Sequence, residues 1–252
     1  MDTQSGWWRT FFSGPVVDFW LAVPTGEQTK HEADFVQEAL RATPPAKLLD
    51  VPCGGGRHCH ALAGRGFAMT GVDLSTGFLD AARAQPVSGP GTIAWEEREM
   101  RDLPWSEEFD GAFSLGNSFG YDDDDGNADF LKSVARALKP GARFVLDTGY
   151  VLESLLPNLQ ERAWYEFGDM LTLAHRRYDP LEGRLHVEYV WVQGGAVERR
   201  SMSARLYSCR EVLRLLVEAG FTDVQGYGSF AREPFKLGAS RLIAVATKAE
   251  KA

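Results

Sequence analysis

The chain has 252 residues, of which 44% are hydrophobic and 12% aromatic, and its formal net charge is −8. A chain of this length can form one large α/β domain with an appendage and a sizeable core. Its acidic balance, with no basic cluster, disfavours a nucleic acid as substrate, and no apolar run reaches the length of a transmembrane helix.

The N-terminal part of the chain is predicted to be helical. Residues 6–23 carry large apolar side chains at roughly helical spacing, interrupted at Gly14-Pro15, and a second helix is expected over residues 29–41. The apolar residues of the first segment are Trp7, Trp8, Phe11, Phe12, Val16, Val17, Phe19 and Trp20. This is too much apolar area to leave in water, so the segment is either ordinary core or a cover for a pocket. We favour an N-terminal helical lid comprising residues 1–43.

A glycine-rich turn follows the first strand-like segment. Residues 47–50 end in Asp50, and Gly54-Gly55-Gly56 then lead into a helix expected over residues 57–65. A strand, a tight glycine turn and a helix N-terminus together allow a backbone to approach a nucleotide cofactor closely.

A second strand, residues 67–72, is followed by Asp73, which is placed to accept hydrogen bonds from both hydroxyl groups of a ribose. The glycine turn does not match the dinucleotide pattern, because Cys59 occupies the position where a third glycine or an alanine is expected. Asp50 would also repel a pyrophosphate, whereas it suits a cofactor that carries an ammonium group.

Strand and helix continue to alternate up to about residue 160, which predicts a parallel, doubly wound sheet. Strands are expected at residues 92–95, 109–115 and 143–147, and helices at 76–85 and 127–138. Residues 122–125 are four consecutive aspartates, expected to form a solvated loop before a helix N-terminus.

The pattern then changes. Residues 161–207 lack a helical period and contain strand-like runs separated by Asp179-Pro180 and Gly194-Gly195, which predicts an antiparallel β insertion of three or four strands. A capping-box helix begins after Ser208, and two strands without an intervening helix close the chain.

Four motifs in this order resemble the class I S-adenosylmethionine (SAM)-dependent methyltransferases, closest to the bacterial small-molecule type. They are D-x-x-C-G-x-G-R at 50–57, G-V-D-L-S at 71–75, G-N-S-F-G-Y at 116–121 and L-K-P-G at 138–141. The resemblance extends over roughly residues 45–248. It implies a seven-stranded Rossmann-like sheet with a reversed last strand, built from residues 44–160 and 208–252. Pro52 departs from the family's first glycine, which is tolerable at a position with negative φ.

The resemblance implies SAM as the cofactor, S-adenosylhomocysteine as its product, and a set of cofactor-binding residues. Gly54 and Gly56 would pass beneath the methionine part, Asp73 would hold the ribose, and Glu99 would accept from the adenine amino group. The full set is Asp50, Pro52, Cys53, Gly54, Gly56, Arg57, Asp73, Leu74, Glu99, Met100, Arg101, Leu115, Gly116 and Asn117. Asp50, Arg57 and Glu99 each have a plainer interpretation as a turn cap or a solvated charge.

The methyl acceptor is less defined. Candidates for contact with the acceptor, or for the lid, are Phe12, Trp20, Tyr121, Asp147, Tyr150 and Arg241. No His-Asp pair has convincing spacing, so no catalytic residue is assigned; His175 and His186 lie on inserted strands, where an ordinary role is the plainer interpretation. Cys53 and Cys59 with nearby histidines match no standard zinc spacing, and no metal is expected.

The sequence therefore predicts methyl transfer from SAM to a small-molecule N, O or C nucleophile by in-line displacement in an enclosed pocket. The alternatives are a non-catalytic SAM-binding module and a nicotinamide-dependent dehydrogenase. Three cysteines without an export signal suggest free thiols in the cytoplasm. A homodimer through the β insertion is a further hypothesis, and neither a nucleic-acid nor a membrane partner is expected.

Overall fold

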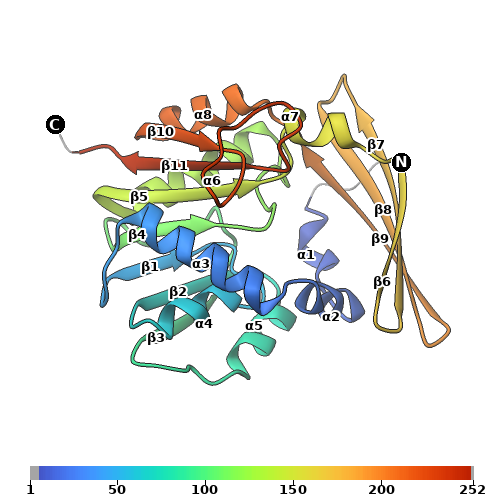
Figure 1. Ribbon diagram of the computed structural model, residues 1–252, viewed down its shortest axis with the longest axis horizontal. Helices are drawn as coiled ribbons and strands as arrows, with labels where there is room; N and C mark the ends of the chain where they lie inside the picture. The colour runs from blue at the N-terminus through green and yellow to red at the C-terminus, as the bar shows by residue number, and fades with distance from the viewer. Residues whose placement is uncertain (1–5, 251–252) are drawn as a thin grey trace.

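Residues 6–250 are described by the structure, which is a computed structural model (Figure 1). They form a seven-stranded mixed sheet with helices on both faces and a separate four-stranded antiparallel sheet. No helix in this part of the chain is long and apolar enough to cross a membrane.

The seven-stranded sheet has the order β10-β11-β5-β4-β1-β2-β3. Strands β1 to β5 run parallel to one another, whereas β11 is antiparallel to both of its neighbours, β5 and β10. The strands are β1 (Lys47–Asp50), β2 (Ala68–Asp73), β3 (Thr92–Glu97), β4 (Phe109–Ser114), β5 (Leu138–Thr148), β10 (Phe221–Tyr227) and β11 (Leu242–Lys248). The expected doubly wound sheet with a reversed last strand is thereby confirmed.

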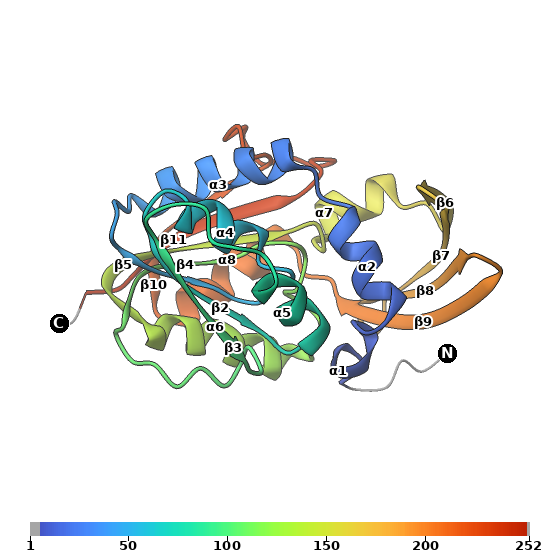
Figure 2. The same cartoon turned by 90° about the horizontal axis from the view of Figure 1, so that it is seen from below.

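The central strands are buried on both faces because helices cover each side, as parallel sheets require. One hydrophobic cluster joins the sheet to α3, α4 and α5, and another joins it to α6 and α8. Figure 2 shows α3 and α6 on opposite sides of the sheet. The helices are α3 (Gly26–Leu40), α4 (Arg57–Ala63), α5 (Thr76–Arg83), α6 (Asp124–Ala137) and α8 (Cys209–Glu218), with the short α7 (Leu152–Leu155) and a 3-10 turn (Leu156–Asn158) after β5.

The β insertion folds as a four-stranded antiparallel sheet in the order β6-β7-β8-β9. Its strands are β6 (Arg162–Phe167), β7 (Met170–Asp179), β8 (Arg184–Gln193) and β9 (Ala196–Arg205). Alternate side chains of one face pack on the N-terminal helices α1 (Trp8–Phe11) and α2 (Pro15–Ala22), forming a third hydrophobic cluster. The N-terminal aromatic residues are therefore part of the contact between the insertion and the rest of the chain.

Three local predictions needed correction. Helix α6 begins at Asp124 rather than at Asn127, because the Asp123 side chain caps it by accepting from the Gly126 N–H at 2.8 Å. Strand β5 begins at Leu138, directly after the helix, and the irregular register near Leu138 accommodates the change of direction. The aspartate run is also not simply solvated, since Asp122 is buried.

The carboxyl ends of the parallel strands point toward α1, α2 and the insertion (Figure 1). In an open α/β sheet, ligands bind at this edge of the strands. The fold therefore places the glycine turn, Asp73 and the tips of β4 and β5 on one side of a space that the insertion covers.

Candidate functional site

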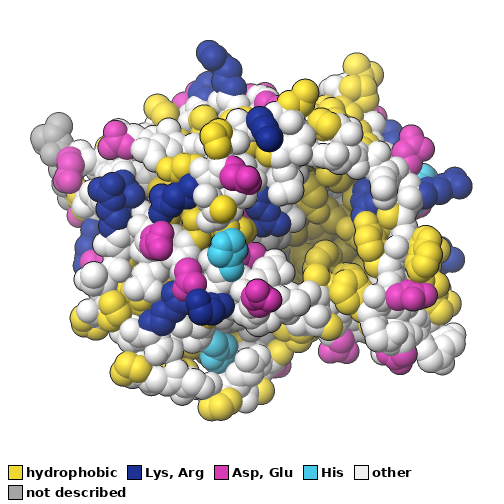
Figure 3. All heavy atoms as spheres, viewed as in Figure 1, with side chains coloured by type: hydrophobic (Ala, Val, Ile, Leu, Met, Phe, Trp, Pro, Cys, Tyr) yellow, Lys and Arg dark blue, Asp and Glu magenta, His cyan; other side chains and the backbone are white. Residues whose placement is uncertain are grey.

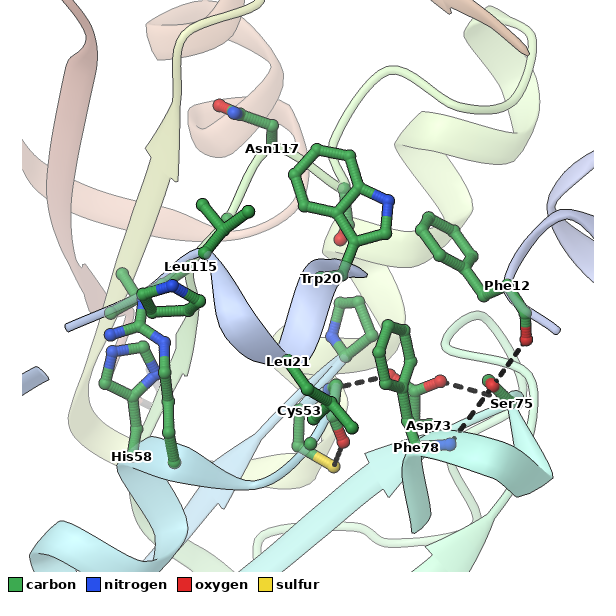
Figure 4. A pocket seen from close by; sticks show the side chains of 18 of the residues that line it. Phe12, Trp20, Leu21, Cys53, His58, Asp73, Ser75, Phe78, Leu115 and Asn117 are labelled. Carbon is green, nitrogen blue, oxygen red and sulfur yellow. Dashed lines mark hydrogen bonds between the residues drawn. The ribbon is translucent and has the colours of Figure 1, made fainter. Parts of the chain in front are cut away.

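A cavity of about 570 Å³ lies between the carboxyl edge of the large sheet, the N-terminal helices and the insertion. Figure 3 shows it as a hollow lined with hydrophobic side chains, and Figure 4 shows part of its wall. This volume lies within the range usual for small-molecule and cofactor sites. All sequence-predicted site residues line the cavity except Asp50, Gly56 and Arg101.

The glycine turn is packed closely from two sides. Gly54 and Gly56 have positive φ values of 52° and 73°, a conformation that favours glycine. A Cβ atom on Gly55 would overlap Leu21 of α2, and one on Gly56 would overlap the ring of Trp95 on β3. Gly56 therefore lies beneath the cavity wall, where it allows α4 to begin close to the sheet.

Asp73 ties the glycine turn to the second strand. One carboxylate oxygen accepts from the Gly54 N–H at 2.7 Å, and the other accepts from the Ser75 N–H at 2.8 Å. Burial raises the pKa of Asp73 to about 6, although these backbone donors favour its ionised form. Asp73 still lines the cavity, so its remaining lone pairs can accept from ligand hydroxyl groups.

Asp50 lies behind the turn rather than on the cavity wall. Its side chain is 1% exposed and accepts a hydrogen bond from the Cys59 thiol at 3.4 Å. Burial raises the pKa of Asp50 to about 8, and the nearby charge of Asp73 acts in the same direction. In this structure the Asp50 side chain therefore does not reach the cavity in which the ammonium group of the cofactor would lie.

One end of the cavity is closed by α3 through a buried ion-pair network that the sequence did not reveal. Arg57 approaches the Glu32 carboxylate at 2.5 Å and donates to the Thr29 hydroxyl at 3.0 Å. His58 shares the same carboxylate at 2.9 Å. Burial opposes ionisation of Glu32, but the hydrogen bond with His58 and the charge of Arg57 lower its pKa to about 2. Burial lowers the pKa of His58.

The opposite end contains Leu74, Phe78, Met100 and Glu99. Glu99 accepts from the Trp8 indole N–H at 3.4 Å, and its carboxylate also pairs with Arg9 at 3.2 Å and with Arg101 at 3.4 Å. Arg101 lies outside the wall, where it bridges Glu99 to Asp122. Glu99, which was predicted to accept a hydrogen bond from the adenine amino group, therefore also holds the N-terminal segment through Trp8 and Arg9.

Hydrogen bonds and an ion pair join the tips of β4 and β5 at the floor of the cavity. The Asp147 carboxylate pairs with Arg241 at 2.9 and 3.0 Å and accepts from the Gly116 N–H at 3.2 Å. The side-chain oxygen of Asn117 accepts from the Gly149 N–H at 2.5 Å. Asn117 has a φ of 72°, an uncommon conformation that asparagine tolerates better than most residues.

Aromatic side chains from several elements form the remaining wall. Phe12 and Tyr121 stack with ring centroids 6.2 Å apart, and the Tyr150 hydroxyl lies 3.8 Å from the sulfur of Met202 on β9. Figure 4 shows Trp20 above Leu21 and Phe12 above Ser75 and Phe78, both reaching into the cavity from the N-terminal segment. Wall residues that the sequence analysis did not name include Trp8, Phe11, Leu21, Gln28, Thr29, Glu32, His58, Ser75, Phe78, Arg98, Ser118 and Met202.

Arg184 of β8 joins the insertion to the loop that carries Tyr121. Its guanidinium donates to the carbonyl oxygens of Tyr121 and Asp122 at 3.0 and 2.9 Å, and to the Ser203 hydroxyl at 3.1 Å. The Arg205 N–H also donates to the Gly120 carbonyl at 2.7 Å. The insertion therefore fixes one part of the cavity wall.

No group of three or more histidine, cysteine, aspartate or glutamate side chains within residues 6–250 has an arrangement that could hold a metal ion. The chemistry available on the wall is that of backbone donors, paired charges, hydroxyl groups and aromatic rings.

Comparison with known proteins shows what this chain is similar to. A family model described as "Methyltransferase domain" matches residues 48–141. A ubiquinone biosynthesis O-methyltransferase from Alkalilimnicola ehrlichii is 30% identical over 117 residues, which are 46% of each chain. The match thus spans about half the length of that curated relative.

Solved structures cover nearly the whole chain. The CcbJ methyltransferase from Streptomyces caelestis has a TM-score of 0.78 at 21% identity, covering 96% of this chain and 99% of that one. A SAM-dependent methyltransferase from Clostridium acetobutylicum has a TM-score of 0.75 at 17% identity, covering 93% and 97%. At these identities the likeness shows a shared fold. Residues 48–141 thus match a methyltransferase domain, and the chain as a whole has the fold of these methyltransferase structures.

A substitution at Arg184 tests the link between the insertion and the cavity wall. Arg184→Met removes the donors to the Tyr121 and Asp122 carbonyls and should cost about 1–3 kcal/mol of stability, because buried acceptors lose their partners. Amide hydrogen exchange in residues 117–123 should accelerate, while exposed Arg210→Met should leave it unchanged. Equal exchange in both variants would show that Arg184 does not hold the loop.

Proposed function

We propose that the protein transfers a methyl group from SAM to a small-molecule acceptor inside the cavity. The observation that carries this proposal is the joint position of the glycine turn and Asp73, hydrogen-bonded to each other and open to the same enclosed space. The predicted role of Asp73 depends on a carboxylate that lines the cavity, and Asp73 meets that condition.

The residues present fit the proposed cofactor. Gly54 has no heavy atom within 4 Å of the position that a Cβ would take, so the turn leaves open space beside its backbone. Asp73 would hold the ribose hydroxyls, Leu74 and Met100 would pack against the adenine, and Arg57 would face the carboxylate of the methionine part. SAM supplies a methyl group made electrophilic by its positively charged sulfur.

The chain itself supplies position and exclusion of water. Holding an acceptor in line with the methyl group can provide much of the acceleration of a displacement reaction. Leu115, Gly116 and Asn117 line the floor at the tip of β4, and the aromatic residues above it keep the space apolar.

Asp73 gives a direct test of the proposed cofactor site. Its pKa of about 6 exceeds the ordinary value, so the cofactor-free protein takes up a proton there as the pH falls through 6. Since the ionised carboxylate accepts from ribose hydroxyls, the affinity for S-adenosylhomocysteine should decrease below pH 6. Asp73→Asn should weaken binding at pH 7.5 by about 2 kcal/mol and flatten this pH dependence.

Isothermal titration calorimetry between pH 5 and pH 8 measures both effects, with exposed Asp80→Asn on α5 as the matched control. Wild-type affinity in Asp73→Asn would remove Asp73 from the site. Absence of binding to SAM and S-adenosylhomocysteine, together with binding of NAD, would refute the proposed function.

We also propose that α1 and α2 act as a lid over the cavity. Leu21 lies on the glycine turn, and the Ser75 hydroxyl donates to the Phe12 carbonyl at 2.7 Å. The Trp8 and Arg9 contacts with Glu99 fasten the segment at the other end. Helix α3, by contrast, packs on the large sheet. Of the lid predicted for residues 1–43, we therefore propose that only the part before Gly26 moves. Residues 1–5 lie outside the described part of the chain.

Hydrogen exchange tests the lid. Amides in residues 8–22 should exchange more slowly when S-adenosylhomocysteine is added, because a ligand beneath the helices opposes their opening. Helix α8, which packs with α6 on one face of the large sheet and takes no part in the cluster of the N-terminal helices, serves as the internal control. Protection of α8 without protection of residues 8–22 would contradict the proposal.

The outer face of the insertion supports the proposed homodimer. Cross-strand register places Trp164, Leu173 and Val190 in one row, and Leu171, Val192 and Val197 in the next. Trp164 is 65% exposed and Val197 is 55% exposed. Such a contiguous apolar surface is characteristic of an interface.

The charges at the edges of this face are self-complementary. Glu166 lies on edge strand β6 and Arg199 on edge strand β9. A two-fold axis parallel to the strands would place β6 of one copy over β9 of the other, so each Glu166 could pair with Arg199 of the second copy. Two such pairs would flank the apolar rows.

Light scattering coupled to size exclusion tests this arrangement. The wild-type protein should be a dimer at micromolar concentration, and Trp164→Glu should be a monomer because it places a charge within the apolar contact. Leu181→Glu, at a turn residue that is 98% exposed, should remain dimeric. A monomeric wild-type protein would contradict the proposal.

We further propose that the protein acts in the cytoplasm on a small molecule rather than on nucleic acid. All three cysteines are free thiols, the net charge is −8, and the cavity is lined by side chains of the N-terminal helices, the carboxyl edge of the large sheet and the insertion.

A further inference from the structure

We infer that the methyl acceptor is an amine that reacts in its neutral form, rather than a hydroxyl compound or a carbon acid. The inference rests on the proposed methyl transfer and specifies its acceptor. A neutral amine attacks through its lone pair and needs no proton removed, whereas a hydroxyl or carbon acceptor needs a base near the reacting atom. The presence or absence of a free base on the cavity wall therefore distinguishes these acceptors.

Four carboxylates line the cavity, and each is already engaged. Glu32 is paired with Arg57 and His58, and its pKa of about 2 makes it a poor proton acceptor. Glu99 is held by Trp8, Arg9 and Arg101. Asp73 binds two backbone N–H groups and faces the proposed ribose position.

Asp147 is the carboxylate closest to the tip of β4, so it needs separate consideration. It is 2% exposed, and burial raises its pKa even though Arg241 opposes the shift. Both of its oxygens face Arg241, and one also accepts from Gly116. Taking up a proton would break this pairing and leave a guanidinium without its counter-ion, which is costly in a partly buried site.

The remaining titratable groups on the wall are also unsuited to be the base. His58 faces Glu32, and burial lowers its pKa. Figure 4 shows His58 beside Leu115 and away from Phe12. Burial raises the pKa of the Cys53 thiol and of the Tyr121 and Tyr150 hydroxyls, so all three stay protonated at neutral pH. Among the described residues of the wall, none is an unengaged base.

An amine completes the reaction without such a group. Its nitrogen lone pair forms the new N–C bond while the electron pair of the breaking S–C bond remains on sulfur. The positive charge passes from sulfur to nitrogen, and the product ammonium loses its extra proton to water after release. Charge and atoms are therefore conserved with no proton transfer in the cavity.

The aromatic wall suits a charge that is positive before and after the reaction. Phe12, Trp20, Tyr121 and Tyr150 come from different elements but line the same cavity. Faces of aromatic rings attract cations, most strongly where water is excluded. A neutral ether product would gain nothing from this wall, whereas the methylated ammonium would be stabilised as it forms.

The test uses pairs of probes that differ only in the attacking atom: benzylamine with benzyl alcohol, cyclohexylamine with cyclohexanol, and aniline with phenol. Transfer of a tritiated methyl group from SAM should label the amine of a pair and leave its hydroxyl partner at background. For labelled amines, kcat/KM should rise tenfold per pH unit up to the amine's own pKa in solution, and the breakpoint should move with the amine.

Calorimetry provides a readout independent of turnover. With S-adenosylhomocysteine bound the sulfur is neutral, so the aromatic wall should bind the protonated amines more tightly than the alcohols, and this advantage should fade as the pH rises through each amine's own pKa. A breakpoint fixed at one pH for every amine would indicate a base on the protein and overturn the inference. The inference would also be overturned if phenol or an alcohol were labelled at the rate of its amine partner. It would be overturned as well if a protein that binds SAM labelled none of the amines. Failure to bind SAM, in contrast, would overturn the proposed function.

Discussion

The buried carboxylate of Asp73 is the interaction on which the rest of the site depends. It binds the N–H of Gly54 and the N–H of Ser75, and the Ser75 hydroxyl both caps α5 and donates to the Phe12 carbonyl. One acid at the end of β2 thus fixes the glycine turn, the start of a helix and the N-terminal segment. Burial raises its pKa to about 6, so its ionised form is held at a cost that donors from a ligand would offset.

The insertion is a structural part of the cavity and not only an appendage. Arg184 and Arg205 bind carbonyl oxygens of residues 120–122, and the Trp7 indole donates to the Ser203 carbonyl at 2.9 Å. These contacts join β8 and β9 to both the loop after β4 and the N-terminal segment. Without these contacts the backbone carbonyls of the loop would lack partners beneath the insertion, so the long Arg184 side chain and the backbone N–H of Arg205 satisfy them.

The sequence was sufficient for the sheet order and for most of the cavity wall, because glycine spacing, alternation of elements and strand-end acids are local signals. It was insufficient where tertiary packing decides the outcome. Nothing local shows that Glu32 of a surface-like helix is buried against Arg57, or that Asp50 turns toward Cys59 and away from the cavity. The start of α6 was misplaced because Asp123 acts as its cap, although an acid before a helix does carry that signal.

Three of the four acids that line the cavity are paired with arginine side chains of the protein itself. Glu32 has Arg57, Asp147 has Arg241, and Glu99 has Arg9 and Arg101, so each carboxylate is already balanced before a ligand enters. These pairs fix the elements that surround the cavity, and in doing so they withdraw the acids from proton transfer. A site of this kind favours reactions that need alignment and exclusion of water more than acid–base exchange. Transfer of a methyl group to a lone pair is such a reaction, because the charge moves from one atom to another within a wall that need not change its protonation.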